Sequence, residues 1–304
     1  MRNILVLLAL CFSSFVYAQT PSEKYQQRYE MLVSQFGPAG VGVETVLDNW
    51  AKVDSTNTRL LLARFDFLFT KSQSVSVVMK DKKKYRGMEP MLTFKDSLQR
   101  NVYCYQETFY DDELYGKAIQ SIDKAIAVHP DKLDFRFVKA NALIAYEKES
   151  PDMAMNYLKS LIAEASRRSA DWTYGEDKVG KDFVEDAMQE YCYSFYSIGS
   201  AQSREAFLNL SVLLSETFPG NIQFMNNIGS YYLLAEDYKT ALKHYSKVLK
   251  KDQKDYTAIK NSALAARRMK NTKLEIKYLQ MMVKYAPEKD ALTAKARLDA
   301  LTRK

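Results

Sequence analysis

The clearest pattern of apolar and polar positions lies between residues 222 and 256. In the second half of this segment, apolar side chains recur at i, i+1, i+4, i+7 and i+8, which is the spacing of one stripe along an α-helix. Lysines occupy the opposite face. The pattern therefore predicts an amphipathic helix that buries one face. The stripe consists of Ala241, Leu242, Tyr245, Val248 and Leu249, and the lysine face consists of Lys239, Lys243, Lys247 and Lys250.

Small and aromatic residues mark the place where this helix should cross a preceding one. Gly229 and Ala241 are small enough for the two helices of a hairpin to approach closely. Tyr232 and Tyr245 are large enough to fill the space beside the crossing. These positions resemble the tetratricopeptide repeat (TPR) family, in which helical hairpins of about 34 residues stack on one another. The resemblance implies an all-α fold, a TPR-type α-solenoid.

The same register continues on both sides of this unit. Pro219 and Pro287 stand at closing turns and are 68 residues apart, which is two periods of about 34 residues. In the next unit Ala263 takes the small position, whereas Glu275 stands where alanine is usual. Second helices are also expected near residues 118–130 and 154–161. The resemblance covers residues 99–289 and implies about five hairpins; residues 290–304 should form a helix that caps the open end.

Residues 19–98 are less regular and are expected to form an N-terminal helical region. The helical period breaks between residues 72 and 98, where apolar residues alternate around Val75 and Val77 and again around Leu92 and Phe94. This alternation predicts a short β-hairpin or an irregular excursion. Such an insertion is either a binding loop or simply an exposed, family-specific segment.

Residues 1–18 read as a secretory signal peptide. Arg2 supplies an early positive charge, an apolar stretch follows, and Ala18 provides a small residue for cleavage. A lipid anchor on Cys11 is the competing reading, but the bulky Leu10 precedes it where a small residue is expected. No other segment has the 18 or so consecutive apolar residues that a transmembrane helix needs. We therefore expect an exported, periplasmic or secreted protein without a transmembrane helix.

Composition supports a folded protein and a protein partner. Hydrophobic residues make up 47% of the chain, with only 10 glycines and 7 prolines in 304 residues, so a sizeable core can form. The formal net charge of +7 is spread over 44 basic and 37 acidic residues. It favours acidic partners mildly, and no concentrated basic stripe indicates nucleic-acid binding. After cleavage only Cys104 and Cys192 remain, either paired or as two thiols.

The sequence offers little catalytic chemistry. His129 opens an HPD tripeptide like that of J-domains, but Pro130 takes the closing turn of a repeat there. His244 lies on the lysine-rich face of its helix. The acidic run Asp111–Glu113 precedes a helix, where it complements the helix dipole. Because phosphate-binding loops, nucleophile elbows and metal-ligand spacings are also absent from the sequence, we expect no enzyme, no cofactor and no metal site.

Binding is therefore the expected function. In the TPR family the first helices line an inner groove that accepts peptides, and this resemblance implies a polar, partly basic groove here. The candidate contacts are Arg136, Lys139, Gln223, Asn226, Asn227, Ser230, Lys260, Asn261 and Arg267. Their charges and amides would hold the backbone and acidic groups of another exported or envelope protein; an ordinary solvated face is the alternative.

The family's carboxylate clamp is not reproduced in this sequence. Asn227 matches the clamp's amide, but Tyr191, Phe195, Thr257 and Asn261 replace its remaining residues. Aromatic residues near 172–196 suggest a second function, an exported binder of small ligands or glycans. Its surface would be formed by Trp172, Tyr174, Tyr191 and Phe195. Neither the partner's identity nor the oligomeric state follows from the residues.

Overall fold

The computed structural model describes residues 20–167 and 172–303. The predicted signal peptide, with Cys11 and Ala18, lies outside the described residues. The chain divides into two compact units. Among the described residues, the first unit comprises 20–72 and 112–128, and the second comprises 73–111 and 129–303.

The first unit consists of four helices. They are α1 (Pro21–Phe36), α2 (Val43–Val53), α3 (Thr58–Lys71) and α4 (Asp112–Val128). Thr20 and Glu23 form a reciprocal capping box at the start of α1, which satisfies two backbone N–H groups. The fully buried Trp50 centres the core of α1–α3, and its indole N–H donates to Ser22 Oγ at 2.7 Å.

Helix α4 packs against α3, although 39 residues separate them in the sequence. Ala118, Ile122 and Ala125 are fully buried on α4, as expected for the second helix of a hairpin. Residues 101–110, however, were assigned to the first repeat and form a strand instead. The chain leaves a helical hairpin after Ser72 and returns to it at Asp112. The physical reason is the run of aromatic and β-branched residues in this segment, which favours extended backbone.

The inserted segment begins the second unit with a three-stranded antiparallel sheet. Its strands are β1 (Gln73–Lys80), β2 (Leu92–Lys95) and β3 (Asn101–Tyr110), in the order β1-β3-β2. In β1, Val77 lies opposite Gln106, and in β2, Phe94 lies opposite Val102. The predicted β excursion is thus confirmed, but it extends to Tyr110 because β3 joins both outer strands.

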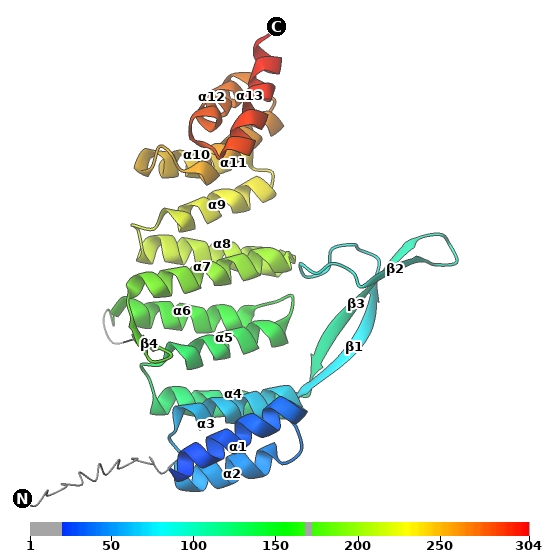
Figure 1. The fold of residues 1–304 in the computed structure, drawn as a ribbon. Helices are drawn as coiled ribbons and strands as arrows, with labels where there is room; N and C mark the ends of the chain where they lie inside the picture. Colours follow the sequence, from blue (N-terminus) through cyan, green and yellow to red (C-terminus); the bar gives the residue numbers. More distant parts are fainter. Residues whose placement is uncertain (1–19, 168–171, 304) are drawn as a thin grey trace, which may run out of the picture. The chain divides into compact units, whose positions relative to one another are not determined.

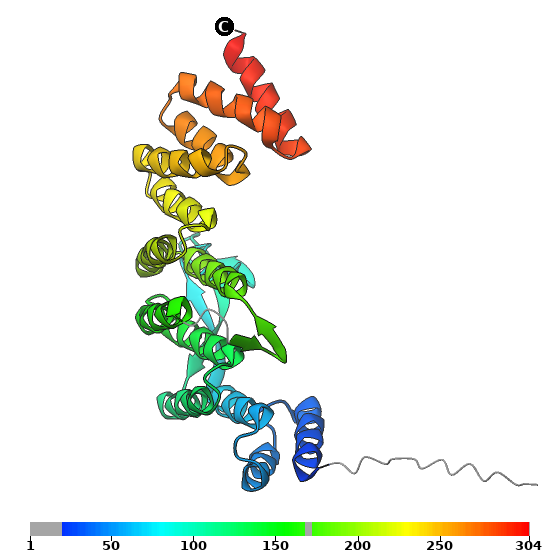
Figure 2. The ribbon, with the colours of Figure 1, turned by 90° about the vertical axis from the view of Figure 1, so that its left-hand side faces the viewer.

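Helical hairpins form the rest of the second unit (Figures 1 and 2). A two-stranded ribbon, β4 (Trp172–Tyr174) and β5 (Asp177–Val179), lies between the first two hairpins in sequence. Consecutive helices pack against each other within each hairpin. The helices are α5 (Leu133–Glu147), α6 (Asp152–Arg167), α7 (Lys181–Ile198), α8 (Ala201–Thr217), α9 (Ile222–Leu234), α10 (Tyr238–Lys251), α11 (Tyr256–Arg268), α12 (Thr272–Tyr285) and α13 (Glu288–Thr302).

The α9–α10 crossing is as close as its small residues predict. A Cβ atom added to Gly229 would lie 2.5 Å from Cε1 of Tyr245, which is too close for any real contact. Ala241 and Tyr245 are fully buried beside it. The Ser230 and Tyr245 hydroxyls are 3.1 Å apart and share a hydrogen bond. Gly229 therefore lets the ring of Tyr245 reach the backbone of the preceding helix.

Glu275 departs from the expected alanine for a reason that lies in α13. Its side chain is buried, and Arg297 Nε donates to Glu275 Oε1 at 2.9 Å. The position thus holds a carboxylate that pairs with the terminal helix, because a buried charge requires a partner. Helix α13, starting two residues before the predicted 290, caps the last hairpin through this pair and through the buried Ala294.

Candidate binding groove on the first helices

Helices α5, α7, α9 and α11 are the first helices of successive hairpins, and three of the predicted groove residues join them. The side-chain amides of Asn227 on α9 and Gln189 on α7 hydrogen-bond reciprocally, at 2.8 and 3.3 Å. Asn226 is buried and donates to Asp255 before α11 at 3.1 Å. Ser230 binds Tyr245, as described above. These polar groups serve the stacking of hairpins, so they do not face the groove with free hydrogen-bonding capacity as predicted.

Arg136 is also committed inside the unit. It is buried on α5, where its guanidinium forms a two-pronged ion pair with Glu164 at 2.8 and 3.0 Å. A further N–H donates to the carbonyl of Pro130 at 2.8 Å, and the ring of Trp172 covers the guanidinium at 4.8 Å. The prediction of a groove contact is therefore wrong for Arg136, since the spacing fixed its helix face but not its partner.

The other basic and amide candidates lie closer to solvent. Lys139 stacks over the ring of Tyr157 at 4.8 Å, and Lys260 pairs with Asp290 of α13 at 3.2 Å. Gln223 and Arg267 are exposed. Within the described residues, Arg267 forms no ion pair. Of the basic candidates, it is the one whose charge is unmatched.

A cleft of about 390 Å³ opens along α7, α9 and α11 and contains two of the predicted residues, Ser230 and Asn261. Its walls carry apolar side chains that remain exposed, including Leu234 at 46% and Leu264 at 41%. Burial raises the pKa of the neighbouring Tyr245 to about 12, so its hydroxyl stays protonated and available for hydrogen bonding. The full lining is Tyr196, Ser230, Leu233, Leu234, Glu236, Tyr238, Asn261, Leu264 and Arg268.

The charge and extent of this cleft suit an extended segment. Arg268 lies at its edge and, like Arg267, forms no ion pair with any described residue. A second hollow of about 470 Å³ adjoins it, because both include Leu234, and Arg204 and Tyr231 line its far side. Sequence reasoning missed Leu234, Leu264 and Arg268. The available signal was the presence of large apolar residues near the ends of two successive first helices.

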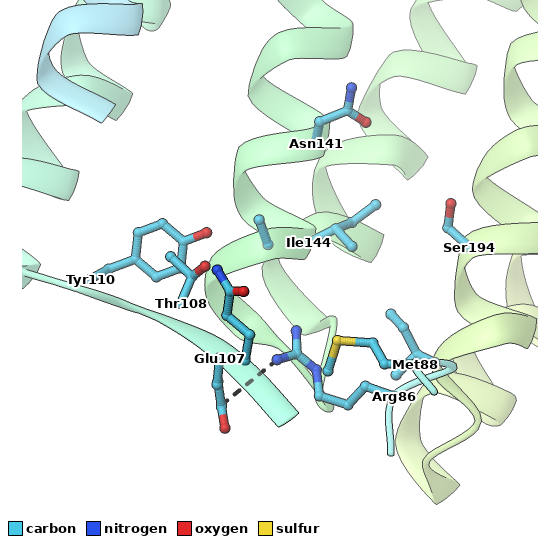
Figure 3. Close-up of a pocket in the computed structure, with 11 residues that line it drawn as sticks. Arg86, Met88, Glu107, Thr108, Tyr110, Asn141, Ile144 and Ser194 are labelled. Carbon is cyan, nitrogen blue, oxygen red and sulfur yellow. Dashed lines mark ion pairs between the residues drawn. The ribbon is translucent and has the colours of Figure 1, made fainter. Parts of the chain in front are cut away.

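A different cavity, of about 350 Å³, lies between the sheet and helices α5 and α7 (Figure 3). Its floor is the buried Glu107 of β3, which accepts from Lys148 Nζ at 2.6 Å and from the Tyr85 hydroxyl at 3.2 Å. Arg86 stands 3.7 Å from the same carboxylate. Burial alone would raise the pKa of Glu107, but Lys148, Tyr85 and Arg86 together lower it below its ordinary value.

Backbone conformation fixes both cations of this cluster. Arg86 and Gly87 have φ of 52° and 75°, and Met88 N–H donates to the Tyr85 carbonyl across this tight turn. A Cβ on Gly87 would lie 2.6 Å from the Ser197 carbonyl oxygen of α7, so only glycine permits this approach. Lys148 also has a positive φ, of 59°. Non-glycine residues rarely adopt this conformation, and here it ties the sheet to α5 and α7.

No family model and no curated protein matches this sequence. Among solved structures, the chain is similar to a tetratricopeptide repeat protein from Parabacteroides merdae, with 8% identity over 93% of this chain and 87% of that one, at a TM-score of 0.38. It is also similar to YrrB, described as a TPR protein with an unusual peptide-binding site (13% identity, 60% and 84% coverage, TM-score 0.37). A third is MamA from Desulfovibrio magneticus RS-1 (13%, 79% and 99%, 0.37). Superpositions at these TM-scores carry no argument about this chain.

The repeat is evident from the chain's own geometry. Helices α9 and α11 begin at Ile222 and Tyr256, and α10 and α12 begin at Tyr238 and Thr272, so both pairs are 34 residues apart. Gly229 and Ala241 meet the expected close crossing. The hairpins are of the tetratricopeptide type. The upstream TPR hairpins follow longer spacings, because the β4–β5 ribbon and longer helices intervene.

The predicted aromatic surface does not form in this TPR unit. Trp172, Tyr191 and Phe195 are buried, and only Tyr174 is exposed, at 45%. Phe137 packs near both Tyr174 and Tyr191, with ring centroids 6.2 Å apart in each case. The aromatics anchor the ribbon and α7 to α5. Their prediction as a surface was wrong because apolar contact with a neighbouring hairpin outweighs exposure to water.

Thiols and imidazoles are held in structural settings. Cys104 and Cys192 are buried and free, so the two cysteines are not paired with each other. Burial raises the pKa of Cys192 to about 12, which keeps it as a thiol. His244 stacks on Tyr232, and burial, followed by the charges of Lys247 and Lys243, lowers its pKa. In the described ranges, no group of three or more His, Cys, Asp or Glu side chains is placed to hold a metal ion.

Between residues 20 and 303, leaving aside 168–171, no helix is both long enough and apolar enough to cross a membrane.

Proposed function

We propose that this chain is an exported, non-catalytic interaction scaffold that binds an extended segment of another exported or envelope protein. The binding site is the cleft of α7, α9 and α11 rather than the whole predicted groove. Export rests on the signal-like residues 1–18, and the binding role on the geometry of the cleft.

One observation carries the proposal. Three successive first helices present exposed apolar side chains around a cleft that also offers hydroxyl and amide groups. Exposed leucines have no role in the packing of a solenoid, and apolar clefts with a few polar groups are the usual form of binding sites. An extended peptide would bury Leu234 and Leu264 and bond through its backbone to Ser230 and Asn261.

The charge of the cleft selects among such segments. Arg267 and Arg268 bring two cations without an ion pair to the end of α11, while Glu236 is the acidic residue in the lining. A guanidinium binds carboxylates through charge-assisted hydrogen bonds. The preferred segment therefore carries an apolar side chain for the leucines and an acidic group for the arginines.

The test is quantitative co-purification of cross-linked partners with cleft variants. Leu234→Glu with Leu264→Glu places charges in the apolar walls, and we expect partner recovery to fall roughly 10-fold or more, since each leucine loses about 1.5–3 kcal/mol of burial. Arg268→Glu should reduce recovery of acidic partners selectively. Leu292→Glu is the matched control, because Leu292 is exposed on α13 outside the cleft. Equal recovery with the double variant and the control would reject the cleft as the site.

A further inference from the structure

The sheet of the second unit presents large apolar side chains to solvent on one face. Opposed residues of antiparallel strands point to the same side, and the register places Val75, Val77 and Met79 of β1 with Leu92 and Phe94 of β2 on one face. All five are classed among the exposed large hydrophobics, with Val77 exposed at 60%. We call these residues the apolar sheet face. Exposed apolar surface of this extent marks an interaction site.

The turn between β2 and β3 adds a protruding apolar tip. Leu98 is 69% exposed, although its turn is well ordered. Asp96 accepts from the backbone N–H groups of Leu98 and Arg100 at 2.8 and 2.9 Å, and the Arg100 side chain closes the turn on the same carboxylate. In Figure 1 the β2–β3 hairpin points away from α5 and α7. Leu98 is thus held outward by a fixed turn.

Basic residues surround this apolar surface. Between residues 79 and 100 there are seven basic and three acidic residues, a net charge of +4 in a chain of net charge +7. Lys82, Lys83 and Lys84 are exposed, and none forms an ion pair with a described residue. Their backbone is nonetheless fixed, since the Tyr105 hydroxyl donates to the Lys82 and Lys83 carbonyls at 2.9 and 2.6 Å. The combination is an apolar tip and face beside an ordered cluster of cations.

We propose that the apolar sheet face, Leu98 and the Lys82–Lys84 cluster together bind the surface of an anionic lipid bilayer. Apolar side chains that protrude from a hairpin enter the boundary between headgroups and acyl chains, and flanking lysines bind the phosphate groups. Self-association of two copies through this surface would bring two cation clusters together, which opposes pairing. The sheet would then hold the second unit at a membrane without a transmembrane helix.

The experiment is sedimentation of the full mature chain with lipid vesicles. Vesicles of phosphatidylcholine alone are compared with vesicles that also contain phosphatidylglycerol, at low and high salt. We expect binding to the anionic vesicles that weakens as salt rises, and little binding to the neutral ones. Absence of binding to anionic vesicles at low salt would overturn the proposal.

Variants separate local recognition from general electrostatic attraction. Lys82→Glu/Lys83→Glu/Lys84→Glu should weaken binding about 100-fold or more, because each lysine near the surface contributes about fivefold. The matched control is Lys243→Glu/Lys247→Glu/Lys250→Glu on the exposed face of α10, which changes the net charge equally and should bind nearly as the native chain does. Equal loss in both triple variants would overturn the proposal.

The apolar part has its own readout. Leu92→Ser/Leu98→Ser should reduce the binding that persists at high salt, whereas circular dichroism should remain unchanged because both side chains are exposed. Sedimentation velocity without vesicles tests the competing occupant. A dimer that dissociates in Leu92→Ser/Leu98→Ser would show that a second copy covers this face and would overturn the membrane assignment. Failure here leaves the cleft proposal intact, since the two surfaces share no residue.

Discussion

Single side chains set how closely the hairpins pack. At Gly229 the absent Cβ admits the ring of Tyr245, and the Tyr245 hydroxyl then bonds Ser230 on the same helix. At Glu275 a carboxylate replaces a small residue because Arg297 reaches it from α13. Both positions convert a local choice of residue into contact between helices.

Replacement of Gly229 by alanine tests this account of the crossing. Gly229→Ala places a Cβ 2.5 Å from the buried Tyr245 ring, and we expect a loss of about 1–3 kcal/mol of unfolding free energy from overpacking. Gly116→Ala is the control, because a Cβ there meets nothing within 4 Å on helix α4, and it should stabilise by roughly 0.5–1 kcal/mol. Guanidinium unfolding measures both. An unchanged midpoint for Gly229→Ala would contradict the close crossing.

Residue type and spacing predicted the crossing but not the polar partners. Gly229, Ala241 and Tyr245 lie in one local pattern, so their roles follow from the sequence. The partner of Arg136 is Glu164, 28 residues away on another helix. Spacing places a side chain on a helix face, whereas its ion pair depends on how the next helix is rotated.

At the scale of elements, the sheet is the main departure from a regular solenoid. The alternation at Val75, Val77, Leu92 and Phe94 predicted β structure, but β3 was read as part of a repeat because its aromatic residues fit a helix face as well as a strand. Pairing of β3 with both β1 and β2 decides the matter, and such pairing is non-local. The cluster around Glu107 then fixes the sheet to α5 and α7.

This attachment should depend on pH. The folded-state pKa of Glu107 lies below its ordinary value of 4.5, so its contribution is complete above that value and is lost as pH falls through the folded-state pKa. In urea unfolding, the native chain should therefore lose stability from neutral pH to below pH 4.5 more steeply than Glu107→Gln. Glu113→Gln, at an exposed carboxylate paired with Lys117, is the control and should behave as the native chain. A pH dependence that is identical in all three proteins would refute the role of Glu107.

At the scale of the molecule, the chain joins a four-helix unit to a TPR unit and a sheet, and the connection runs through a split hairpin. Sequence periodicity recovered the hairpins from residue 222 onward, where the spacing is exactly regular, and lost register upstream, where insertions lengthen it. The cleft was only half predicted, through Ser230 and Asn261. Exposure of Leu234 and Leu264 could not be foreseen, because apolar residues in a repeat are usually buried.

The central claim is that the cleft of α7, α9 and α11 binds a partner segment. A photo-activatable cross-linking residue placed at Leu264 in otherwise native protein, in living cells, tests it most directly, with the same residue at Leu292 of α13 as the control. The account predicts a discrete cross-linked partner at position 264 that disappears when Arg268→Glu is added, and no such product at 292. The same products at both positions, or none at 264, would contradict it.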